Sequence, residues 1–408
     1  MGRTVYCGRQ VTAALLCGVA LFSSAAAADW TSTLDGSVRY YSWTSDHGWP
    51  PNWPGGKGKG DQLYIPFGYR LGTNDGITDF SITARSGYVS SSQDTTGVKG
   101  SSSSFTDSSL SSTYSYLGWA GFQPALSLAL NLPTGRTNFQ GNSKNGKMDP
   151  DVVALGVTGE GFNFAPTLSA NVPLSETSML GFGVGYTSRG AFRREGTLPG
   201  TTTKLNPGDV TTFNASYGYQ DETVALQLAA SYSLESTTTL DGAQFYRSGD
   251  RWLLSATLAY AWNENWTTQA GVSMSHYGKN DVLTLGLPPL IAELFNSNSN
   301  SYPMSLSTSY AGEDFSIGPK LTYLYRDHNA WSPTSYQFLP AKSSWSFGLE
   351  GSYAASDTLN FTGSVERGWV HESDNPDKLL GGIIIPGTGV PPYSTDSWRF
   401  SIGASIGL

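Results

Sequence analysis

Cysteine is nearly absent from this chain of 408 residues, and both cysteines, Cys7 and Cys17, stand close to its beginning. We expect the segment that contains them to be removed, which would leave a mature chain without cysteine. A disulfide framework, a catalytic thiol and a cysteine-based metal site are therefore excluded. The fold must instead be held by a large core or by closed backbone pairing.

Charge and long apolar runs are also scarce. Only 14% of the residues are charged, whereas aromatic residues make up 13% and glycine occurs 48 times. Beyond the N-terminal segment no run of ~18 apolar residues exists, which excludes a helical membrane protein. The net charge is −8; without Arg3 and Arg9, 22 basic residues face 32 acidic ones, leaving −10. This balance argues against nucleic acid as a partner.

Catalytic motifs are missing as well. The four histidines, His47, His276, His328 and His371, are scattered and show no metal-binding spacing. The chain has no nucleophile elbow and no phosphate loop. We therefore expect no enzyme, no metal site and no cofactor.

The first residues have the anatomy of a signal peptide. Two arginines precede a short apolar stretch over 11–22, and four alanines at 25–28 supply a cleavage site. The apolar stretch is too short to span a bilayer. A lipoprotein would use Cys17, but Leu16 precedes it where a small residue is needed. We expect a signal peptide over 1–28 and export of the rest.

The remainder is dominated by alternation with period two. In the segment 252–262 the apolar row carries a tryptophan at each end and consists of Trp252, Leu254, Ala256, Leu258, Tyr260 and Trp262. Such a row is typical of a lipid-facing strand with an aromatic residue at both membrane interfaces. Residues 29–408 are therefore predicted to form one all-β domain, a transmembrane antiparallel up-and-down β-barrel of about 16 strands. The expected strands are 32–44, 61–72, 77–90, 108–120, 123–133, 160–174, 178–190, 210–220, 223–235, 250–262, 265–278, 301–312, 314–328, 342–354, 358–371 and 396–408.

The connections alternate between short and long, as in outer-membrane barrels of Gram-negative bacteria. Seven short turns are expected near 73–76, 121–122, 175–177, 221–222, 263–265, 313–314 and 356–357. Eight longer loops are expected near 45–60, 91–107, 134–159, 191–209, 236–249, 279–300, 329–341 and 372–395. A soluble sandwich would also alternate, but without paired aromatic ends or this strict order.

The apolar row of the last strand is Trp398, Phe400, Ile402, Ala404, Ile406 and Leu408. Ser401, Gly403, Ile406 and Leu408 resemble the terminal signal that the barrel-insertion machinery recognises, which makes that machinery an expected partner besides outer-membrane lipid. The usual final aromatic residue is a leucine here, which is a departure from the pattern.

Basic residues of the lumenal row are the candidate selectivity residues. Arg39, Arg70, Arg85 and Arg399 lie on strands that are neighbours in a closed barrel, and Arg39, Arg85 and Arg399 are expected at similar heights. A basic patch of this kind favours anions. Alternatively, these arginines pair with lumenal acids such as Asp79, Glu350 and Glu366. Lys320 and Arg326 add lumenal basic charge elsewhere.

The third long loop, 134–159, is the longest. By analogy with general porins we hypothesise that it folds into the lumen, with Asp149 and Asp151 facing the basic wall. Gly181, Gly183 and Gly185 alternate onto the lumenal side of a nearby strand, where they permit curvature or make room for a loop.

Several outer loops are unusually apolar, and exposed apolar surface usually has a use. Either these loops pack together as a cap, or they capture an apolar or aromatic solute. The candidate capture residues are Trp49, Trp53, Leu290, Ile291 and Phe295.

The whole mature chain resembles Gram-negative outer-membrane channels and porins in its pattern. More locally, the segment 130–135 (Leu-Asn-Leu-Pro-Thr-Gly), followed by a Gly/Asn-rich loop with Asp149 and Asp151, resembles transporter barrels associated with phenol meta-cleavage pathways. That local resemblance implies uptake of aromatic or other apolar compounds.

We therefore expect an outer-membrane channel for passive uptake of small solutes. The alternatives are a general anion-preferring porin and, from another class, a surface interaction barrel with a plugged lumen. The oligomeric state stays open, and a homo-trimer is one candidate assembly.

Overall fold

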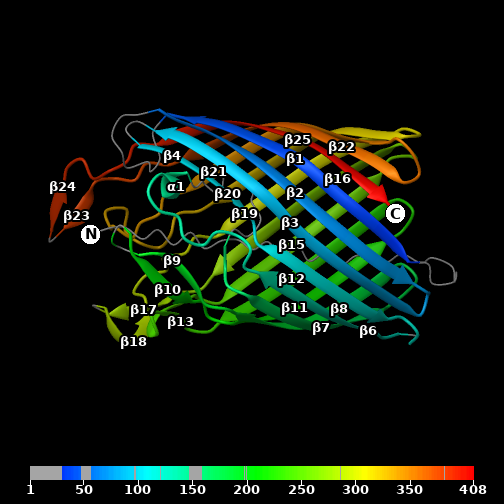
Figure 1. Cartoon of the computed structure of the whole chain (residues 1–408), viewed down its shortest axis with the longest axis horizontal. Helices are drawn as coiled ribbons and strands as arrows, with labels where there is room; N and C mark the ends of the chain where they lie inside the picture. Colours follow the sequence, from blue (N-terminus) through cyan, green and yellow to red (C-terminus); the bar gives the residue numbers. More distant parts are fainter. Residues whose placement is uncertain are drawn as a thin grey trace.

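The protein forms a closed antiparallel barrel of sixteen strands in a computed structural model (Figure 1). The structure describes residues 30–46, 57–95, 98–119, 121–146, 159–196, 198, 200–284, 286–380 and 382–408. The barrel closes between its first and last strands, where Thr33 lies opposite Gly407 and Ser45 opposite Thr395. Closure pairs the backbone of every wall strand on both sides, so the sheet has no edge.

The predicted strands are confirmed with small differences at their ends. The wall strands, in order around the barrel, are β1 (Thr31–Ser45), β2 (Gly58–Asn74), β3 (Thr78–Thr95), β5 (Ser108–Tyr116), β6 (Gln123–Leu132), β7 (Asn163–Pro173), β8 (Ser178–Arg189), β11 (Val210–Gln220), β12 (Val224–Glu235), β15 (Arg251–Ala261), β16 (Trp266–Tyr277), β19 (Ser301–Ala311), β20 (Phe315–Arg326), β21 (Lys342–Ala354), β22 (Leu359–Glu372) and β25 (Tyr393–Gly407). Short turns and Leu408 lie at one end of the barrel, the turn end, and the long connections lie at the other, the loop end (Figure 1).

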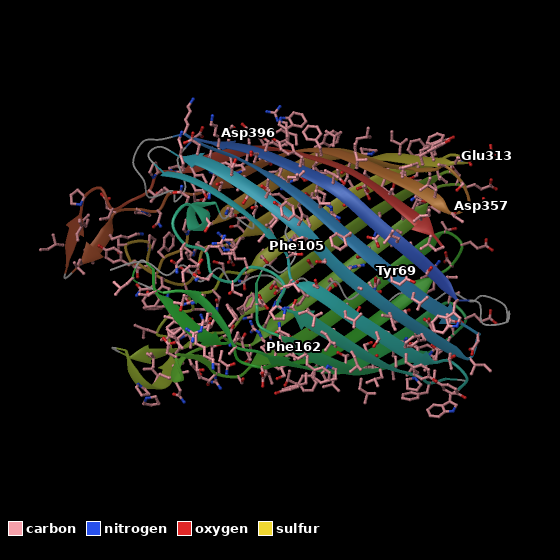
Figure 2. The ribbon with its side chains drawn as sticks, viewed as in Figure 1. Tyr69, Phe105, Phe162, Glu313, Asp357 and Asp396 are labelled. Atoms are coloured by element: carbon pink, nitrogen blue, oxygen red, sulfur yellow. The ribbon has the colours of Figure 1, made fainter. Side chains whose placement is uncertain are left out.

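Alternation gives the barrel two chemically different faces. On β15, Leu254 and Leu258 point outward and are 46% and 45% exposed. The intervening Ser255 lies opposite Ala229 and Ser273, so small side chains face one another across the inner surface. Figure 2 shows side chains along the outside of the wall, including the aromatic rings of Tyr69 and Phe105. The apolar side chains therefore face outward and the polar ones inward, the reverse of a soluble barrel.

One expected loop is a strand hairpin. We predicted a loop over 91–107, but β3 continues to Thr95 and pairs with β4 (Val98–Phe105), so that Ser91 lies opposite Ser102. The prediction was wrong because the serine-rich stretch 101–104 has no apolar alternation. Beyond the apolar belt a strand can be held by backbone pairing alone, and such pairing leaves no pattern in the side chains.

Other long connections contain regular structure of their own. Three successive loops contribute hairpins to a six-stranded sheet at the loop end, formed by β9 (Phe192–Glu195), β10 (Thr202–Asn206), β13 (Thr238–Leu240), β14 (Ala243–Arg247), β17 (Asp281–Thr284) and β18 (Leu287–Ala292). A further hairpin consists of β23 (Lys378–Leu380) and β24 (Ile383–Ile385). The helix α1 (Asn142–Asn145) lies in the third long loop. Among the described residues no helix has the length and apolar character needed to cross a membrane.

Aspartates fix the short turns. The carboxylate of Asp221 accepts hydrogen bonds from the Tyr219 hydroxyl (2.7 Å) and from the backbone N–H groups of Thr223 (2.8 Å) and Val224 (2.7 Å). These donors, the Tyr219 hydroxyl foremost, hold the pKa of Asp221 below its ordinary value of 3.8. The backbone N–H of Thr78 is the main cause of a similarly lowered pKa at Asp75. Both turns are stabilised only while the carboxylate is ionised.

We predict that Asp221→Ala lowers the temperature at which the unboiled barrel loses its fast electrophoretic migration at pH 7. Because the folded-state pKa is depressed, the stabilisation is complete above pH 3.8 and is lost as the pH falls through the lower folded-state pKa. The difference between wild type and variant should therefore disappear in strong acid. Asp357→Ala is the matched control, since that turn carboxylate makes no hydrogen bond within the described residues. An equal loss in both variants would contradict this account.

Candidate functional site

The inner surface is divided into an ionic and a neutral sector. The ionic sector consists of the contiguous strands β20, β21, β22, β25, β1, β2 and β3. Its inward charged residues are Asp35, Arg39, Arg70, Asp79, Arg85, Lys320, Arg326, Lys342, Glu350, Glu366, Glu372 and Arg399. The neutral sector runs from β5 to β19. Its described inward residues are mostly Ser, Thr, Gly, Ala and Asn, with charge only at the loop end, at Arg189, Glu235 and Arg251.

Two of the predicted basic residues are paired. The Arg399 Nη1 lies 2.7 Å from Glu366 Oε1, and the Lys320 Nζ lies 3.2 Å from Glu350 Oε2. Glu366 and Arg399 lie directly opposite each other on neighbouring strands. Lys320 lies opposite Gly348 and reaches Glu350, two residues farther along β21. For these two basic residues the structure shows the alternative that we left open, an ion pair with a lumenal acid.

The other three arginines of the predicted basic patch are not held in ion pairs of this kind. Within the described residues Arg39, Arg70 and Arg85 form no ion pair. The Arg39 Nε donates to Ser37 Oγ at 3.2 Å, and its guanidinium lies 5.9 Å from the centre of the Tyr64 ring. Although they point inward, all three arginines are exposed. Water therefore reaches the ionic sector from inside the barrel.

Asp35 and Arg85 lie on either side of a glycine. Gly68 is the cross-strand partner of both, and a Cβ placed on it would be 2.9 Å from Asp35 Oδ1. A larger residue at Gly68 would push the carboxylate aside. Along the ladder Arg39 lies opposite Ser401, whereas Asp35 and Arg85 occupy a row nearer the turn end.

Arg326 belongs to a separate cluster under the loops. It lies opposite Lys342, which is 6% exposed and whose Nζ is 3.6 Å from Glu372 Oε2. The Tyr393 hydroxyl also donates to Glu372, at 3.2 Å. This cluster joins β20, β21, β22 and β25 where the loops cover the barrel.

Asp107 closes the third long loop at its base. Its Oδ1 accepts the backbone N–H of Gly135 (2.8 Å), and its Oδ2 accepts that of Glu160 (2.7 Å) and the amide of Asn131 (2.9 Å). The residue is only 7% exposed. One buried carboxylate thus holds both ends of the connection. Asp107 directly precedes a predicted strand, but no pattern in the sequence predicts its hydrogen-bond partners.

The described part of this loop, 134–146, lies against the inner wall. The Ser91 hydroxyl donates to the Gly146 carbonyl at 2.6 Å, and Ser91 points inward from β3. Earlier in the same loop, the Phe139 N–H donates to Glu195 Oε1 of β9 at 3.0 Å. The loop therefore runs between the β3–β4 wall and the loop sheet. Asp149 and Asp151 lie outside the described residues, so their role stays a prediction.

Other loops form a cap over the loop end. Asn329, 1% exposed, donates to the Gln337 carbonyl at 2.6 Å and accepts from the Leu339 N–H at 3.1 Å. Lys378, also 1% exposed, donates to the Pro333 carbonyl at 2.9 Å. The Asn329 bonds hold the connection before β21 together, and the Lys378 bond joins it to the connection that contains β23. We did not predict either polar residue.

Three of the five predicted capture residues are described, and they lie in the connection between β16 and β19. Phe295 packs against Trp331 with ring centres 5.2 Å apart, as part of the cap. Leu290 and Ile291 lie on β18 of the loop sheet, where Ile291 is 50% exposed. Trp49 and Trp53 lie outside the described residues, so solute capture stays a prediction. Gly181, Gly183 and Gly185 lie on the inner face of β8, as expected.

Among the described residues, no three His, Cys, Asp or Glu side chains lie close enough together to hold a metal ion.

The chain resembles solved outer-membrane proteins only distantly. No family model matches the chain, and no curated protein matches it. A FadL homologue of Pseudomonas aeruginosa has 9% identity and a TM-score of 0.46, with 92% of this chain and 90% of that one covered. The toluene transporter TodX of P. putida has 11% identity and a TM-score of 0.41, with coverage of 93% and 90%. OccK7 of P. aeruginosa has 11% identity and a TM-score of 0.43, with coverage of 93% and 100%. These likenesses are too distant to carry a function.

We predict that Asp107→Ala frees the loop at both ends. Each lost hydrogen bond to the buried carboxylate is worth roughly 1.5 kcal/mol, so local opening should rise by about tenfold or more. Trypsin cleavage at the exposed Arg136 of the folded protein measures this. The control is Asp94→Ala, which removes an acid that pairs with Lys99 on the same hairpin. Unchanged cleavage in the Asp107 variant would show that the loop is held elsewhere.

Proposed function

We propose that this protein is an outer-membrane channel through which small water-soluble solutes diffuse, with anions favoured over cations. The observation that carries the proposal is a set of inward-facing, exposed arginines, Arg39, Arg70 and Arg85, which form no ion pair with any residue that the structure describes. Charged side chains that face a water-accessible lumen set ion preference directly.

The outer surface supports a place in a lipid bilayer. A closed barrel satisfies its backbone hydrogen bonds internally, which is the condition for strands to cross a membrane. Its outward side chains are apolar around the circumference, for example Leu168, Leu258, Phe347 and Ile402, which are 60%, 45%, 56% and 74% exposed. Lipid rather than water is the natural solvent for such a face.

The lumen supports passage rather than a packed interior. Barrels of about 16 strands enclose more space than side chains of ordinary size can fill. Here many inward residues are small, and the exposure of Arg39, Arg70 and Arg85 supports an interior that water reaches at their level. This exposure argues against the alternative of an interaction barrel with a fully plugged lumen.

The two sectors support a preference for anions. Once the pairs of Arg399 and Lys320 are set aside, three arginines face two aspartates, Asp35 and Asp79, in the open part of the ionic sector. An anion would follow the arginines on one side while the hydroxyl groups of the neutral sector hydrogen bond to it from the other. The loop 134–146 and the cap would exclude large solutes at the loop end.

A second candidate is uptake of aromatic or other apolar compounds. It is favoured by the aliphatic surface of the β23–β24 hairpin, where Leu379, Leu380, Ile383 and Ile384 are 44%, 60%, 71% and 58% exposed. The polar lumen disfavours this candidate as the main route, because an apolar solute gains nothing from a hydroxyl-lined wall. We propose no enzymatic activity.

We predict that replacing Arg39, Arg70 and Arg85 together by Gln shifts selectivity toward cations. A charge about 4 Å from a passing ion contributes ~1 kcal/mol in water, so the chloride-to-potassium permeability ratio should fall roughly fivefold. Reversal potentials in a potassium chloride gradient across a planar bilayer measure this ratio. The matched control is the double variant Lys320→Gln and Glu350→Gln, which removes an ion pair and no net charge.

The same recording tests the proposal as a whole. Wild-type protein should give stable unit steps of current with anion preference. A correctly folded barrel without conductance would overturn the channel, and an unchanged ratio in the triple variant would overturn the role of the arginines.

A further inference from the structure

Charge on the outward face of the wall is confined to one patch. The outward Asp, Glu, Lys and Arg side chains of the described wall strands and of β4 are Lys59, Asp61, Asp94, Lys99, Arg367 and Asp396. All of them lie near the loop end of contiguous strands, from β22 and β25 through β1 to β4. Charge is costly in the middle of a lipid-facing belt and costs little near the membrane interface. This group, the outer polar patch, therefore faces something other than acyl chains.

The outer polar patch consists of two adjacent rows of cross-strand partners that run across the same strands. The row nearer the apolar belt is Arg367, Trp398, Ser42, Asp61, Ser92 and Ser101. The row nearer the loop end is Trp369, Asp396, Thr44, Lys59, Asp94 and Lys99. Cations, carboxylates and hydroxyl groups are interspersed in both rows, so hydrogen-bond donors and acceptors lie side by side across the patch.

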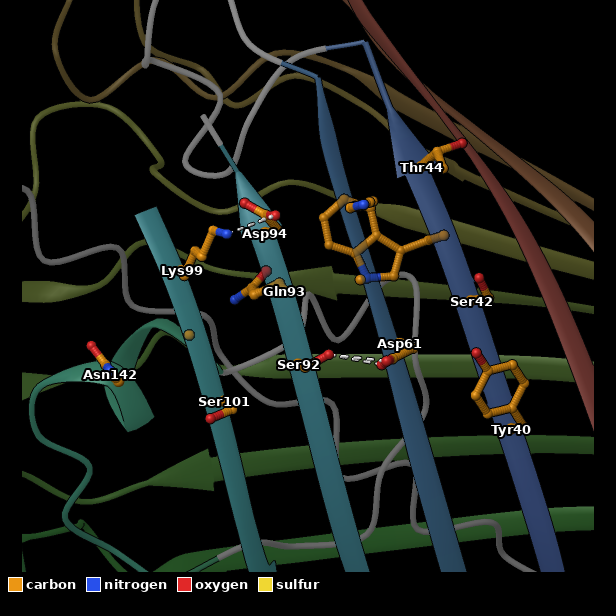
Figure 3. A pocket seen from close by; sticks show the side chains of 14 residues that line it. Tyr40, Ser42, Thr44, Asp61, Ser92, Gln93, Asp94, Lys99, Ser101 and Asn142 are labelled. Carbon is orange, nitrogen blue, oxygen red and sulfur yellow. Dashed lines mark hydrogen bonds and ion pairs between the residues drawn. The ribbon is translucent and has the colours of Figure 1, made fainter. Parts of the chain in front are cut away.

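The charged groups of the patch are accessible and keep capacity for a ligand. The side chain of Lys99 is 81% exposed, with its Nζ 3.6 Å from Asp94 Oδ2. Lys59 is exposed and makes no ion pair within the described ranges. The Ser92 hydroxyl donates to the Asp61 carboxylate and lies 2.9 and 2.8 Å from its two oxygens (Figure 3). A carboxylate has about four lone-pair sites, so Asp61 can accept further hydrogen bonds.

A cavity of about 560 Å³ opens within the β1 to β4 part of the patch. Its lining includes Ser42, Thr44, Lys59, Asp61, Asp94 and Lys99 (Figure 3). Tyr40, which is 42% exposed, borders the cavity on the side of the apolar belt. The volume is in the range of small-molecule sites. The patch therefore offers space as well as polar groups.

Tryptophans mark the height of the patch on the wall. The Arg367 guanidinium lies 5.3 Å from the ring centres of both Trp369 and Trp398, and its Nη2 is 3.7 Å from Asp396 Oδ1. Figure 2 shows Asp396 on the outside of the wall near the loop end. Toward the turn end the same face becomes apolar, with Ile402 74% exposed. Tryptophan is typical of the membrane interface, and the long loops of outer-membrane barrels are extracellular. The patch therefore lies at the height of the headgroups of the outer leaflet.

We propose that the outer polar patch binds the phosphorylated sugar headgroup of an outer-leaflet glycolipid. The proposal rests on the placement of the barrel in an outer membrane. Lys59 and Lys99 bind phosphate groups, and Asp61 accepts hydrogen bonds from sugar hydroxyl groups. The hydroxyl groups of Ser42 and Thr44 donate and accept. A phospholipid without a sugar would satisfy the lysines and leave Asp61 without a donor from the ligand.

The test measures lipid binding to the folded barrel in detergent by native mass spectrometry. The probes are deep-rough lipopolysaccharide, which carries sugars and phosphate groups, and dioleoyl phosphatidate, which carries phosphate without sugar. Wild type should bind the lipopolysaccharide more tightly than the phosphatidate. Replacing Lys59 and Lys99 together by Gln should weaken lipopolysaccharide binding about 25-fold, because each cation near an anionic headgroup contributes about fivefold.

Asp61→Asn separates recognition of sugar from attraction of charge. Removing this acid should strengthen binding of phosphatidate, since it removes a repulsion. The preference for lipopolysaccharide over phosphatidate should nevertheless fall about tenfold, because a hydrogen bond to a charged group contributes at least that factor. An equal gain for both lipids would overturn the recognition of sugar.

A matched control removes two cations at the same end of the barrel but outside the patch. Arg193 and Lys204 are exposed cross-strand partners on the β9–β10 hairpin, and replacing both by Gln should leave lipopolysaccharide binding as in wild type. The unboiled electrophoretic shift checks the folding of every variant. An equal loss in this control would show general attraction of charge and overturn the site.

Two further outcomes would overturn the proposal. One is unchanged lipopolysaccharide binding in the double lysine variant. The other is a wild-type dimer mass that the lysine variant loses, which would assign the patch to a second copy of this chain. Failure of the channel function is distinguishable, because it appears as absence of conductance in a barrel that still binds the glycolipid with the predicted preference.

Discussion

The pairing of β1 with β25 is the constraint on which the rest of the structure depends. Thirteen residue pairs, from Thr33–Gly407 to Ser45–Thr395, join the first strand to the last. Without this seam the sheet would have two edges whose backbone groups lipid could not satisfy. With it, every wall strand has two neighbours, and alternation along each strand assigns one face to the outside and the other to the lumen.

Function follows from how charge is distributed on the inner face. The seam itself lies inside the ionic sector, so closure brings Arg399 of β25 next to Tyr41 and Arg39 of β1. Opposite them lies a wall of small hydroxyl-bearing and glycine residues. The lumen is therefore asymmetric in charge. Single buried groups fasten the covering loops: Asp107 holds the two ends of one loop, and Lys378 of β23 bonds to a neighbouring loop. These buried groups are structural, whereas the exposed arginines remain available to solutes.

Most of the barrel could be predicted from the sequence because alternation and turn length are local signals. Where no local signal exists, prediction failed: the serine-rich β4 lacks apolar alternation, and the loop sheet joins hairpins from three separate connections. The lumenal position of Arg39 and Arg399 was predictable from parity, but only the register shows that Arg399 pairs with Glu366. Asp107 acts on residues 28 and 53 positions away, and no pattern in the sequence reports such partners. The signal peptide, the trimer, the insertion signal and the local resemblance to the phenol-pathway transporters stay predictions.

The most direct test of the account is chemical access to two neighbouring residues of β19. Ser305 points inward and Leu306 outward, where it is 47% exposed. With Cys7 and Cys17 removed, each would be replaced by cysteine in protein inserted into lipid vesicles and treated with a membrane-impermeant thiol reagent. We predict rapid labelling of Ser305→Cys and almost none of Leu306→Cys. Equal labelling of both, or labelling of Leu306→Cys alone, would contradict a lipid-facing outer surface around a water-filled lumen.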